Sequence, residues 1–479
     1  MKIGFSIAII PLLLLCSCND ERKLTTSSRE ALAAYTEGVE LLDKFYYAEA
    51  KSALERAIAL DSTFAMASAR LAILYQRSGN DAAASREIAE AVRKSAHATQ
   101  REQLFIRMFN HDIHFRNTLA AAVADSLIML YPKEAEVYVL RGKYYELSKR
   151  YDQALALYEK AMTMDTSYAP AVMSLGYAYS AQGQVEKAIE AMERYIRLAP
   201  DAADPRASFA DILMRFGRYD EAFEQYSKSL ELKPDYWYSI NRLGDIYALR
   251  GQLNQADKQY DLGMTKMVMN DQTRATHLAT EGMLNLQRGK YDEALRLGEQ
   301  SLALDSTNFR AFFVQTMACI KLKKFSDAKE MLETIRSEIA RRNLSESQFM
   351  LEFLVLRARF FNAQGQFEEA LAACDSAMEY GSELTRASVY QEIAEIKLQQ
   401  GDTDGSLDAL EEALRYNPNY PQALLTLTKV YKATGDRQMT NEIGNRLLTL
   451  WKNADSDFQP LVELNTLIGK QHARASLPS

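Results

Sequence analysis

The chain has 479 residues, of which 47% are hydrophobic and 25% are charged, a composition typical of folded globular proteins rather than of disordered or fibrous chains. Its formal charge is −7, from 57 Lys and Arg against 64 Asp and Glu, and it has no basic tract, which argues against a nucleic-acid-binding surface. Length alone predicts about three domains, but internal repeats override that prediction.

The first 18 residues have the pattern of a leader. Lys2 precedes an apolar run from Ile3 to Leu15, and Cys16-Ser17-Cys18 follows. The run is too short to span a bilayer comfortably and has the length of a signal-peptide core.

The end of this leader resembles a bacterial lipoprotein signal, in which a Leu three places before and a small residue directly before an invariant Cys direct lipidation and cleavage. Leu15 and Ser17 fit this frame with Cys18 as the acylated residue, and Cys16 fits less well because Leu15 would take the small-residue place. A plain secretory signal with chance cysteines is the alternative.

The resemblance implies a signal peptide at residues 1–17 and a lipid-anchored membrane protein of the bacterial cell envelope. We expect the outer membrane, with the protein facing the periplasm or the cell surface. Residues 18–30 would then comprise the acylated cysteine, which anchors stably when it carries several acyl chains, and a polar tether without periodicity.

From residue 31 to 454 the chain repeats one pattern about 34 residues long. In the unit 135–168, Gly142 lies in an apolar first half, and Ala154 and Ala161 share one helical face in the second half. Small residues at these places predict two helices that touch closely, joined as a hairpin.

The repeat resembles the tetratricopeptide repeat, with its large residue, small residue, Tyr, turn Gly, two Ala and closing Pro. We place units at 31–64, 65–98, 101–134, 135–168, 169–202, 203–236, 237–270, 275–308, 309–342, 351–384, 387–420 and 421–454. The twentieth residue of each unit is small: Ala50, Ala84, Ala120, Ala154, Ala188, Ala222, Ala256, Ala294, Ala328, Ala370, Ser406 and Thr440. The resemblance implies an all-α, right-handed superhelical solenoid.

Extra residues between some of the units, such as residues 271–274, divide this solenoid into an array of units 1–7 (31–270) and an array of units 8–12 (271–454). Residues 455–479 follow, and the apolar spacing from Asp457 to His472 predicts a C-terminal capping helix, because a terminal repeat needs a solvated cover. An exposed, partner-binding helix is the alternative.

No catalytic constellation stands out, so we expect no enzyme and no cofactor. His111 and His114 could share a helical face toward a metal, but no third ligand is near in sequence, and a structural role is the preferred interpretation. Cys319 and Cys374 fall in packing columns and are expected to be buried thiols, although a disulfide between them is left open.

In such arrays the first helices line a concave groove. The inward fifth and ninth places of the central units hold polar groups between flexible apolar ones, which suits an extended peptide. The candidate partner-binding residues are Met173, Tyr177, Asp211, Asn241, Asp245, Met283, Phe313, Met317 and Arg359. We expect Asp211 and Asp245 to form an acidic patch without a structural role, and hence a neutral or basic partner. A merely solvated inner wall is the alternative.

These patterns predict a non-catalytic, membrane-anchored scaffold that mediates protein–protein interactions. The alternative is a surface glycan-binding or nutrient-uptake accessory lipoprotein. Proteins of that kind use Trp platforms on long insertions, whereas this chain has only Trp237 and Trp451. The cluster Tyr236-Trp237-Tyr238 could stack on a sugar, but packing between units is the simpler explanation.

Overall fold

The structure, a computed structural model, describes residues 24–267, 269–342, 344, 348–380 and 385–469. Within these ranges it is all-helical, with 25 α-helices, one short 3₁₀ helix and no strand. The first half of the helices comprises α1 (Arg29–Asp43), α2 (Tyr47–Leu60), α3 (Ala65–Arg77), α4 (Asp81–Lys94), η1 (Ser95–His97), α5 (Gln100–Ile113), α6 (Asn117–Leu130), α7 (Ala135–Leu147), α8 (Tyr151–Met164), α9 (Ala169–Ala181), α10 (Val185–Leu198), α11 (Asp204–Arg215) and α12 (Tyr219–Leu232). The second half comprises α13 (Trp237–Leu249), α14 (Leu253–Met264), α15 (Asp271–Gln287), α16 (Tyr291–Leu304), α17 (Phe309–Lys321), α18 (Phe325–Arg341), α19 (Gln348–Asn362), α20 (Phe367–Met378), α21 (Arg386–Gln399), α22 (Thr403–Tyr416), α23 (Pro421–Thr434), α24 (Arg437–Leu450) and α25 (Gln459–Leu467).

The helices from α1 to α24 pair as twelve successive antiparallel hairpins, which confirms the predicted solenoid of helical hairpins. The small-residue column lies where the two helices of each hairpin cross. Its ten alanines and Ser406 are fully buried, and Thr440 is 4% exposed. Close packing at these crossings therefore explains the column.

Each hairpin turns at one residue with a left-handed backbone. Eight hairpins use Gly there, as the sequence predicts, with φ between +70° and +83°. The other four place a larger residue in the same conformation: Phe45, Phe115, Lys149 and Lys323, with φ from 56° to 59°. A left-handed backbone costs a non-glycine residue roughly 1–2 kcal/mol, so the surrounding packing must hold these four turns in place.

Two boundaries differ from the predicted units. The slack before unit 8 is absorbed into α15, which begins at Asp271 with a capping box from Asn270. The capping helix is shorter than the apolar spacing suggested, since α25 spans Gln459–Leu467 and residues 470–479 lie outside the described part. Leu464 of α25 is fully buried against the last hairpin, in agreement with a cover for the terminal repeat.

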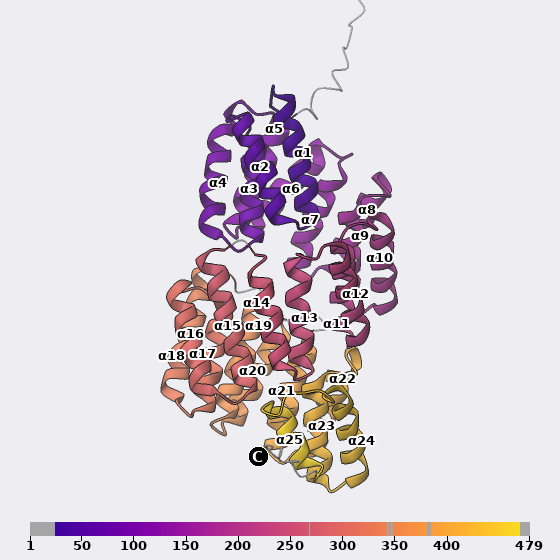
Figure 1. Cartoon of the computed structure of the whole chain (residues 1–479), viewed down its shortest axis with the longest axis vertical. Helices are drawn as coiled ribbons and strands as arrows, with labels where there is room; N and C mark the ends of the chain where they lie inside the picture. Colours follow the sequence, from indigo (N-terminus) through magenta and orange to yellow (C-terminus); the bar gives the residue numbers. More distant parts are fainter. Residues whose placement is uncertain (1–23, 268, 343, 345–347, 381–384, 470–479) are drawn as a thin grey trace, which may run out of the picture.

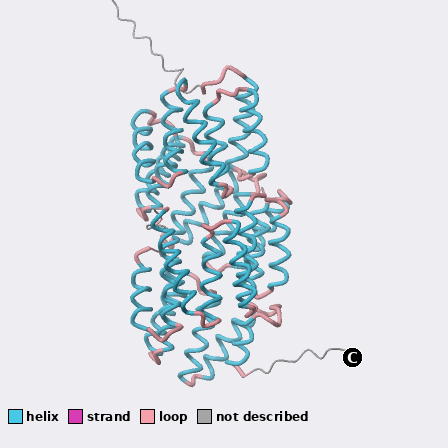
Figure 2. The backbone as a smooth tube through the Cα atoms, turned by 90° about the vertical axis from the view of Figure 1, so that its left-hand side faces the viewer, coloured by secondary structure: helices cyan, strands magenta, loops and turns pink. Residues whose placement is uncertain are grey.

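The hairpins wind into a superhelix whose second turn lies directly on the first (Figures 1 and 2). We call the surface between the two turns the seam. Contacts across it join residues 184 to 261 positions apart: Lys233 with Glu49, Arg342 with Asp81, Lys149 with the carbonyl of Glu379, Asn419 with the carbonyl of Gly217, and Trp451 with the carbonyl of Leu249. In each pair, a hairpin turn or its neighbour meets a loop between hairpins that lies one superhelical turn later in the chain.

Residues 24–26, which belong to the stretch 18–30 predicted as a polar tether, contact the first and third hairpins. The backbone N–H of Thr25 donates to Glu102 Oε1 at 2.9 Å, and the Thr26 hydroxyl donates to Asp61 Oδ2 at 2.6 Å. Leu24 packs against the N-terminal core. Cys16 and Cys18 lie outside the described residues. Among the described helices, none has the length and apolar character needed to cross a bilayer.

Candidate functional site

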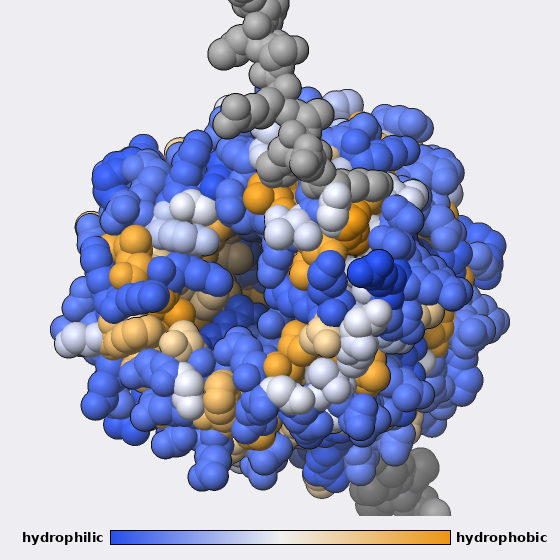
Figure 3. Space-filling model, turned by 90° about the horizontal axis from the view of Figure 1, so that it is seen from below, coloured by the Kyte–Doolittle hydropathy of each residue, from blue (hydrophilic) through white to orange (hydrophobic). Residues whose placement is uncertain are grey.

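The first helices of the hairpins line the inside of the superhelix, which is hollowed when viewed along its long axis (Figure 3). A cavity of about 750 Å³ lies against α15, α17, α19 and α21, and Ser78, Gly79 and Asp81 from one superhelical turn earlier close one side. We call it the main cavity. Its wall includes the second, fifth and ninth places of successive units, which are the places expected to face the groove. Three of the predicted partner-binding residues lie there: Met283, Phe313 and Arg359.

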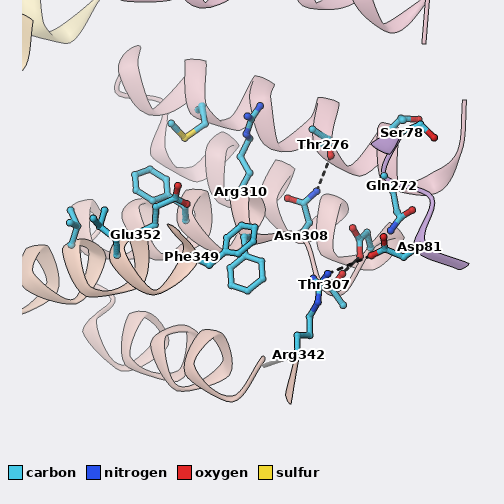
Figure 4. A pocket seen from close by; sticks show the side chains of 18 of the residues that line it. Ser78, Asp81, Gln272, Thr276, Thr307, Asn308, Arg310, Arg342, Phe349 and Glu352 are labelled. Carbon is cyan, nitrogen blue, oxygen red and sulfur yellow. Dashed lines mark hydrogen bonds and ion pairs between the residues drawn. The ribbon is translucent and has the colours of Figure 1, made fainter. Parts of the chain in front are cut away.

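Aromatic rings form one side of the main cavity (Figure 4). Phe309 and Phe349 are stacked with ring centroids 4.2 Å apart and planes inclined by 24°. Phe313 lies one helical turn after Phe309 on α17, and the guanidinium of Arg359 sits 5.9 Å from its ring centroid. These rings are only partly buried, so they offer an apolar surface to whatever enters.

Polar groups face the same space. Asn308 caps α17 by accepting from the backbone N–H of Ala311 at 3.0 Å, and its amide donates to Thr276 Oγ1 at 3.3 Å (Figure 4). Arg310 donates to Thr280 Oγ1 at 2.6 Å, and its side chain is exposed toward the cavity. Within the described part of the chain, no carboxylate forms an ion pair with Arg310.

The formal charges around the main cavity are balanced. Three carboxylates and three guanidinium groups line it: Asp81, Asp305, Glu352, Arg310, Arg342 and Arg359. Arg342 faces Asp81 across the seam at 3.5 Å, and Arg359 pairs with the buried Glu392 at 2.7 Å. Burial raises the pKa of Asp81, and the nearby Arg342 opposes that shift.

A second cavity of about 360 Å³ shares Met283 and Arg310 with the main cavity. It is lined by α13 and α15 on one side and by the start of α23 and the segment around Phe458 on the other. Asp245, another predicted residue, lies in its wall. The hollow therefore continues from the main cavity toward the C-terminal hairpin.

The predicted acidic patch is wrong, because its carboxylates already have partners. Asp211 is 6% exposed and accepts hydrogen bonds from the hydroxyls of Tyr226, Tyr238 and Tyr177, the latter two at 2.6 and 3.2 Å. Arg242 also donates to it, with 3.0 Å between Nε and Oδ1. Asp211 is thus a node that joins four helices rather than a free groove carboxylate.

Asp245 is compensated by the same arginine. Arg242 Nη1 lies 2.5 Å from Asp245 Oδ2, and the hydroxyl of Tyr260 donates to the other oxygen at 2.7 Å. Both carboxylates are thus hydrogen-bonded within the protein, and neither is the free groove carboxylate on which the expectation of a basic partner rested, although the single guanidinium leaves the three groups with one net negative charge.

One further carboxylate of this region has an unusual pKa. Burial raises the pKa of Asp204, at the start of α11, to about 7, although Tyr195 and Tyr236 donate to it at 2.7 and 3.0 Å and oppose that rise. Both hydroxyls have a raised pKa because of their own burial beside this carboxyl. The group holds units 5 and 6 together, and Tyr236 is also the N-cap residue of α13, the first helix of unit 7.

The remaining predicted residues take part in packing. Met173 packs with the core of units 4 and 5, and Met317 packs beside the core of units 9 and 10. Asn241 approaches α14, where its side chain leaves no room for a Cβ at Gly263.

Sequence reasoning missed Arg242, Arg310 and the tyrosines around Asp211. Arg310 occupies the second place of its unit and Arg242 the sixth, both of which face inward, whereas the prediction rested on the fifth and ninth places. Tyr226 and Tyr260 stand at the same place of the second helix in successive units, so their recurrence was the available signal.

The histidines and cysteines considered above do not form a metal site or a disulfide in the described part of the chain. In the described part of the chain, no group of three or more His, Cys, Asp or Glu side chains is placed to hold a metal ion. Burial lowers the pKa of His111. Cys319 and Cys374 are both buried, free thiols, and burial raises the pKa of each.

The aromatic cluster at residues 236–238 packs across the seam. Tyr236 is 1% exposed and meets Tyr46 edge-on, with centroids 5.9 Å apart. The ring centroids of Trp237 and Tyr47 are 6.3 Å apart, and the side chain of Trp451 is 3% exposed. The rings are thus used to join the superhelical turns.

Comparison with known proteins identifies the repeats. Family models of the tetratricopeptide repeat match residues 116–169, 147–208, 205–236 and 387–420. These segments, which include hairpins of both superhelical turns, are therefore tetratricopeptide repeats. No curated protein matches the sequence.

Several solved structures resemble the chain. The crystal structure of yeast Tom70 is 15% identical over 93% of this chain and 97% of that chain, with a TM-score of 0.40. A tetratricopeptide repeat protein from Parabacteroides merdae is 16% identical over 56% of this chain and 98% of that chain, with a TM-score of 0.38. MamA is 23% identical over 33% of this chain and 93% of that chain, with a TM-score of 0.28. At these TM-scores the superpositions say nothing about the course of the superhelix or its partners.

Proposed function

We propose that this protein is a non-catalytic tetratricopeptide repeat scaffold that holds an extended segment of another protein in the main cavity, and that Cys18 anchors it to a membrane of the bacterial cell envelope. Tetratricopeptide repeats point to protein–protein interaction. The observation that carries the proposal is the main cavity itself, in which partly exposed rings and hydrogen-bonding groups from four first helices converge.

The chemistry of this wall suits an uncharged segment with at least one large apolar side chain. Phe309, Phe313 and Phe349 accept that side chain, while Thr276, Asn308 and Arg310 offer hydrogen bonds to the backbone on either side. The balanced charges around the cavity favour neither a basic nor an acidic segment.

Anchoring rests on the leader pattern that ends in Cys18. The docking of residues 24–26 supports it, because the chain would then leave the superhelix at one defined place on the way to the membrane. We place the protein at the outer membrane, facing the periplasm or the surface.

A glycan-binding accessory lipoprotein is the second candidate. Its stacking platforms would have to come from Trp237 and Trp451, and both pack against other aromatic rings across or near the seam. The scaffold is accordingly the better supported function.

Partner capture from detergent-solubilised envelopes tests the proposal. Phe313→Ala removes a ring of the main cavity and is expected to lose the proteins that co-purify with the wild type. Phe325→Ala is the matched control, because Phe325 is equally half-buried beside the same core but lies on α18, outside the cavity. Equal capture by the two variants would refute binding in the main cavity.

The anchor is tested separately. Cys18→Ala is expected to abolish acyl labelling and to release the protein from the membrane fraction. Acyl labelling that persists in this variant would assign the acyl group to another residue, Cys16 first.

A further inference from the structure

Helix α6 differs from every other outer helix of the superhelix. Asp125 is its only charged side chain, whereas each of the other eleven second helices carries at least three. Asp125 is paired, with 2.6 Å between its Oδ1 and Nε of Arg141 on α7. The outer surface of α6 is therefore close to electrically neutral.

This surface is also apolar. Met129 is 82% exposed, more than any other large hydrophobic residue of the described chain, and Leu119 and Leu130 are each 50% exposed. With the exposed Ala122, these side chains fall within an arc of about 100° at roughly 100° per residue. Ser126 shares the arc, and its hydroxyl is satisfied by the carbonyl of Ala122 at 3.0 Å. We call these five residues the α6 face.

The α6 face belongs to the hairpin from which the N-terminal segment departs. The backbone N–H of Thr25 is bound by Glu102, in the first turn of α5, and the Thr25 hydroxyl accepts from the backbone N–H of Thr99 at 3.3 Å. Because α5 and α6 are antiparallel, the start of α5 lies at the same end as Met129 and Leu130. Thr25, which follows the first described residue, therefore lies at this end of the hairpin.

The chain outside the structure is short on this side. Leu24 comes six positions after Cys18, and six residue steps reach about 20 Å at full extension. α6 itself, from Asn117 to Leu130, is about 21 Å long. A lipid on Cys18 would thus keep the membrane surface within reach of the whole helix.

We propose that the α6 face lies in the interfacial layer of the membrane that holds the Cys18 lipid. This inference rests on the proposed lipidation. A neutral face with Leu and Met side chains enters this layer without desolvating an unpaired charge, and the burial of its apolar area favours contact. The helices run roughly along the long axis of the superhelix, so the molecule lies on its side on the bilayer (Figure 1).

The test uses the full acylated chain on vesicles of phosphatidylethanolamine and phosphatidylglycerol. A fluorophore on Met129→Cys is quenched by lipids that carry a nitroxide on the acyl chain. Ala303→Cys is the matched control, since Ala303 occupies the same place of its unit on α16 and is also exposed. We expect quenching at position 129 to exceed that at position 303 several-fold. Equal quenching, in a sample whose mass shows acylated Cys18, would overturn the inference and leave the anchor in place.

Two further outcomes separate the alternatives. If the mass shows no acyl chain, the proposed anchor fails and the inference fails with it. If the fluorophore at 129 becomes shielded in the unlipidated Cys18→Ala protein as its concentration rises, a second copy of the chain covers the α6 face, and the membrane contact is refuted. The pair Leu119→Glu and Met129→Glu should reduce quenching of a fluorophore on Leu130→Cys while the acylated protein still sediments with the vesicles.

Discussion

Trp451 and Leu249 are 202 residues apart in the sequence, yet the indole N–H of Trp451 donates to the carbonyl of Leu249 at 3.0 Å. Two residues further on, the carbonyl of Gly251 accepts from the backbone N–H of Asp455 at 2.9 Å. The seam is thus made by direct bonds between one hairpin turn and the chain one superhelical turn later.

The seam makes Gly251 intolerant of a side chain. A Cβ there would lie 2.5 Å from the ring of Phe458 and 2.7 Å from the Cβ of Ala454. Gly365 has the same left-handed backbone, with φ of 74° against 71°, but nothing within 4 Å. In urea unfolding, we expect Gly365→Ala to cost about 1–2 kcal/mol from backbone strain alone, and Gly251→Ala to cost a further 1–3 kcal/mol from overpacking. Equal losses would show that the turns do not touch here.

The Asp211 node predicts a structural role in place of a binding role. Asp211→Ala leaves three tyrosine hydroxyls and Arg242 without their shared acceptor. We expect the free energy of unfolding to fall by roughly 2–4 kcal/mol, between the cost of an unsatisfied buried donor and that of a broken buried ion pair. The exposed Glu186→Gln should stay within about ±0.5 kcal/mol. A small loss at Asp211 would restore it as a candidate contact residue.

The alanine column predicts a steep cost of overpacking. Ala188 is fully buried where α10 crosses α9. Ala188→Leu is expected to destabilise by about 1–3 kcal/mol, because the larger side chain forces the hairpin apart. Ala303→Leu makes the same change at an exposed place on α16 and should be nearly neutral. Chemical unfolding measures both variants. Equal losses in the free energy of unfolding would show that the assigned positions of the repeat are wrong.

Asp204 predicts a pH dependence of stability. Its pKa is raised from the ordinary 3.8 to about 7 in the folded protein, so the folded state holds a proton that the unfolded chain releases. Stability therefore falls as the pH rises from about 4 to 7, by about 4 kcal/mol at most, and the loss is complete above pH 7. Asp204→Asn should flatten this slope in unfolding titrations at pH 5, 6, 7 and 8. An unchanged slope would assign it to other buried carboxyls.

Much of the fold could be predicted from the sequence because local rules decide it. Close crossings require small residues, which placed Ala188 and its column, and left-handed turns favour glycine, which placed Gly251 and Gly365. The left-handed turn at Lys149 was not predicted, because a lysine there carries no local signal for this backbone conformation. Its partners, the carbonyl of Glu379 and the ring of Tyr380, lie in the next superhelical turn.

The seam and the site could not be predicted to the same depth. Whether one superhelical turn rests on the next depends on small rotations summed over several hairpins, which no local pattern encodes. One side of the main cavity is closed where Asp81 and Arg342 pair across that seam, and this pairing could not be predicted. The sequence could predict only the inner wall with Met283, Phe313 and Arg359. Asp211 was misjudged because its tyrosine partners come from other helices.

Site-specific photo-crosslinking tests the binding of a partner segment in the main cavity most directly. A photoreactive phenylalanine analogue placed at Phe313, in the cavity, is compared with the same analogue at Phe325, on the outer helix of the same hairpin. We predict a discrete covalent adduct with another protein from position 313 after irradiation of intact cells, and none from position 325. Adducts from position 325 without any from position 313 would contradict the account.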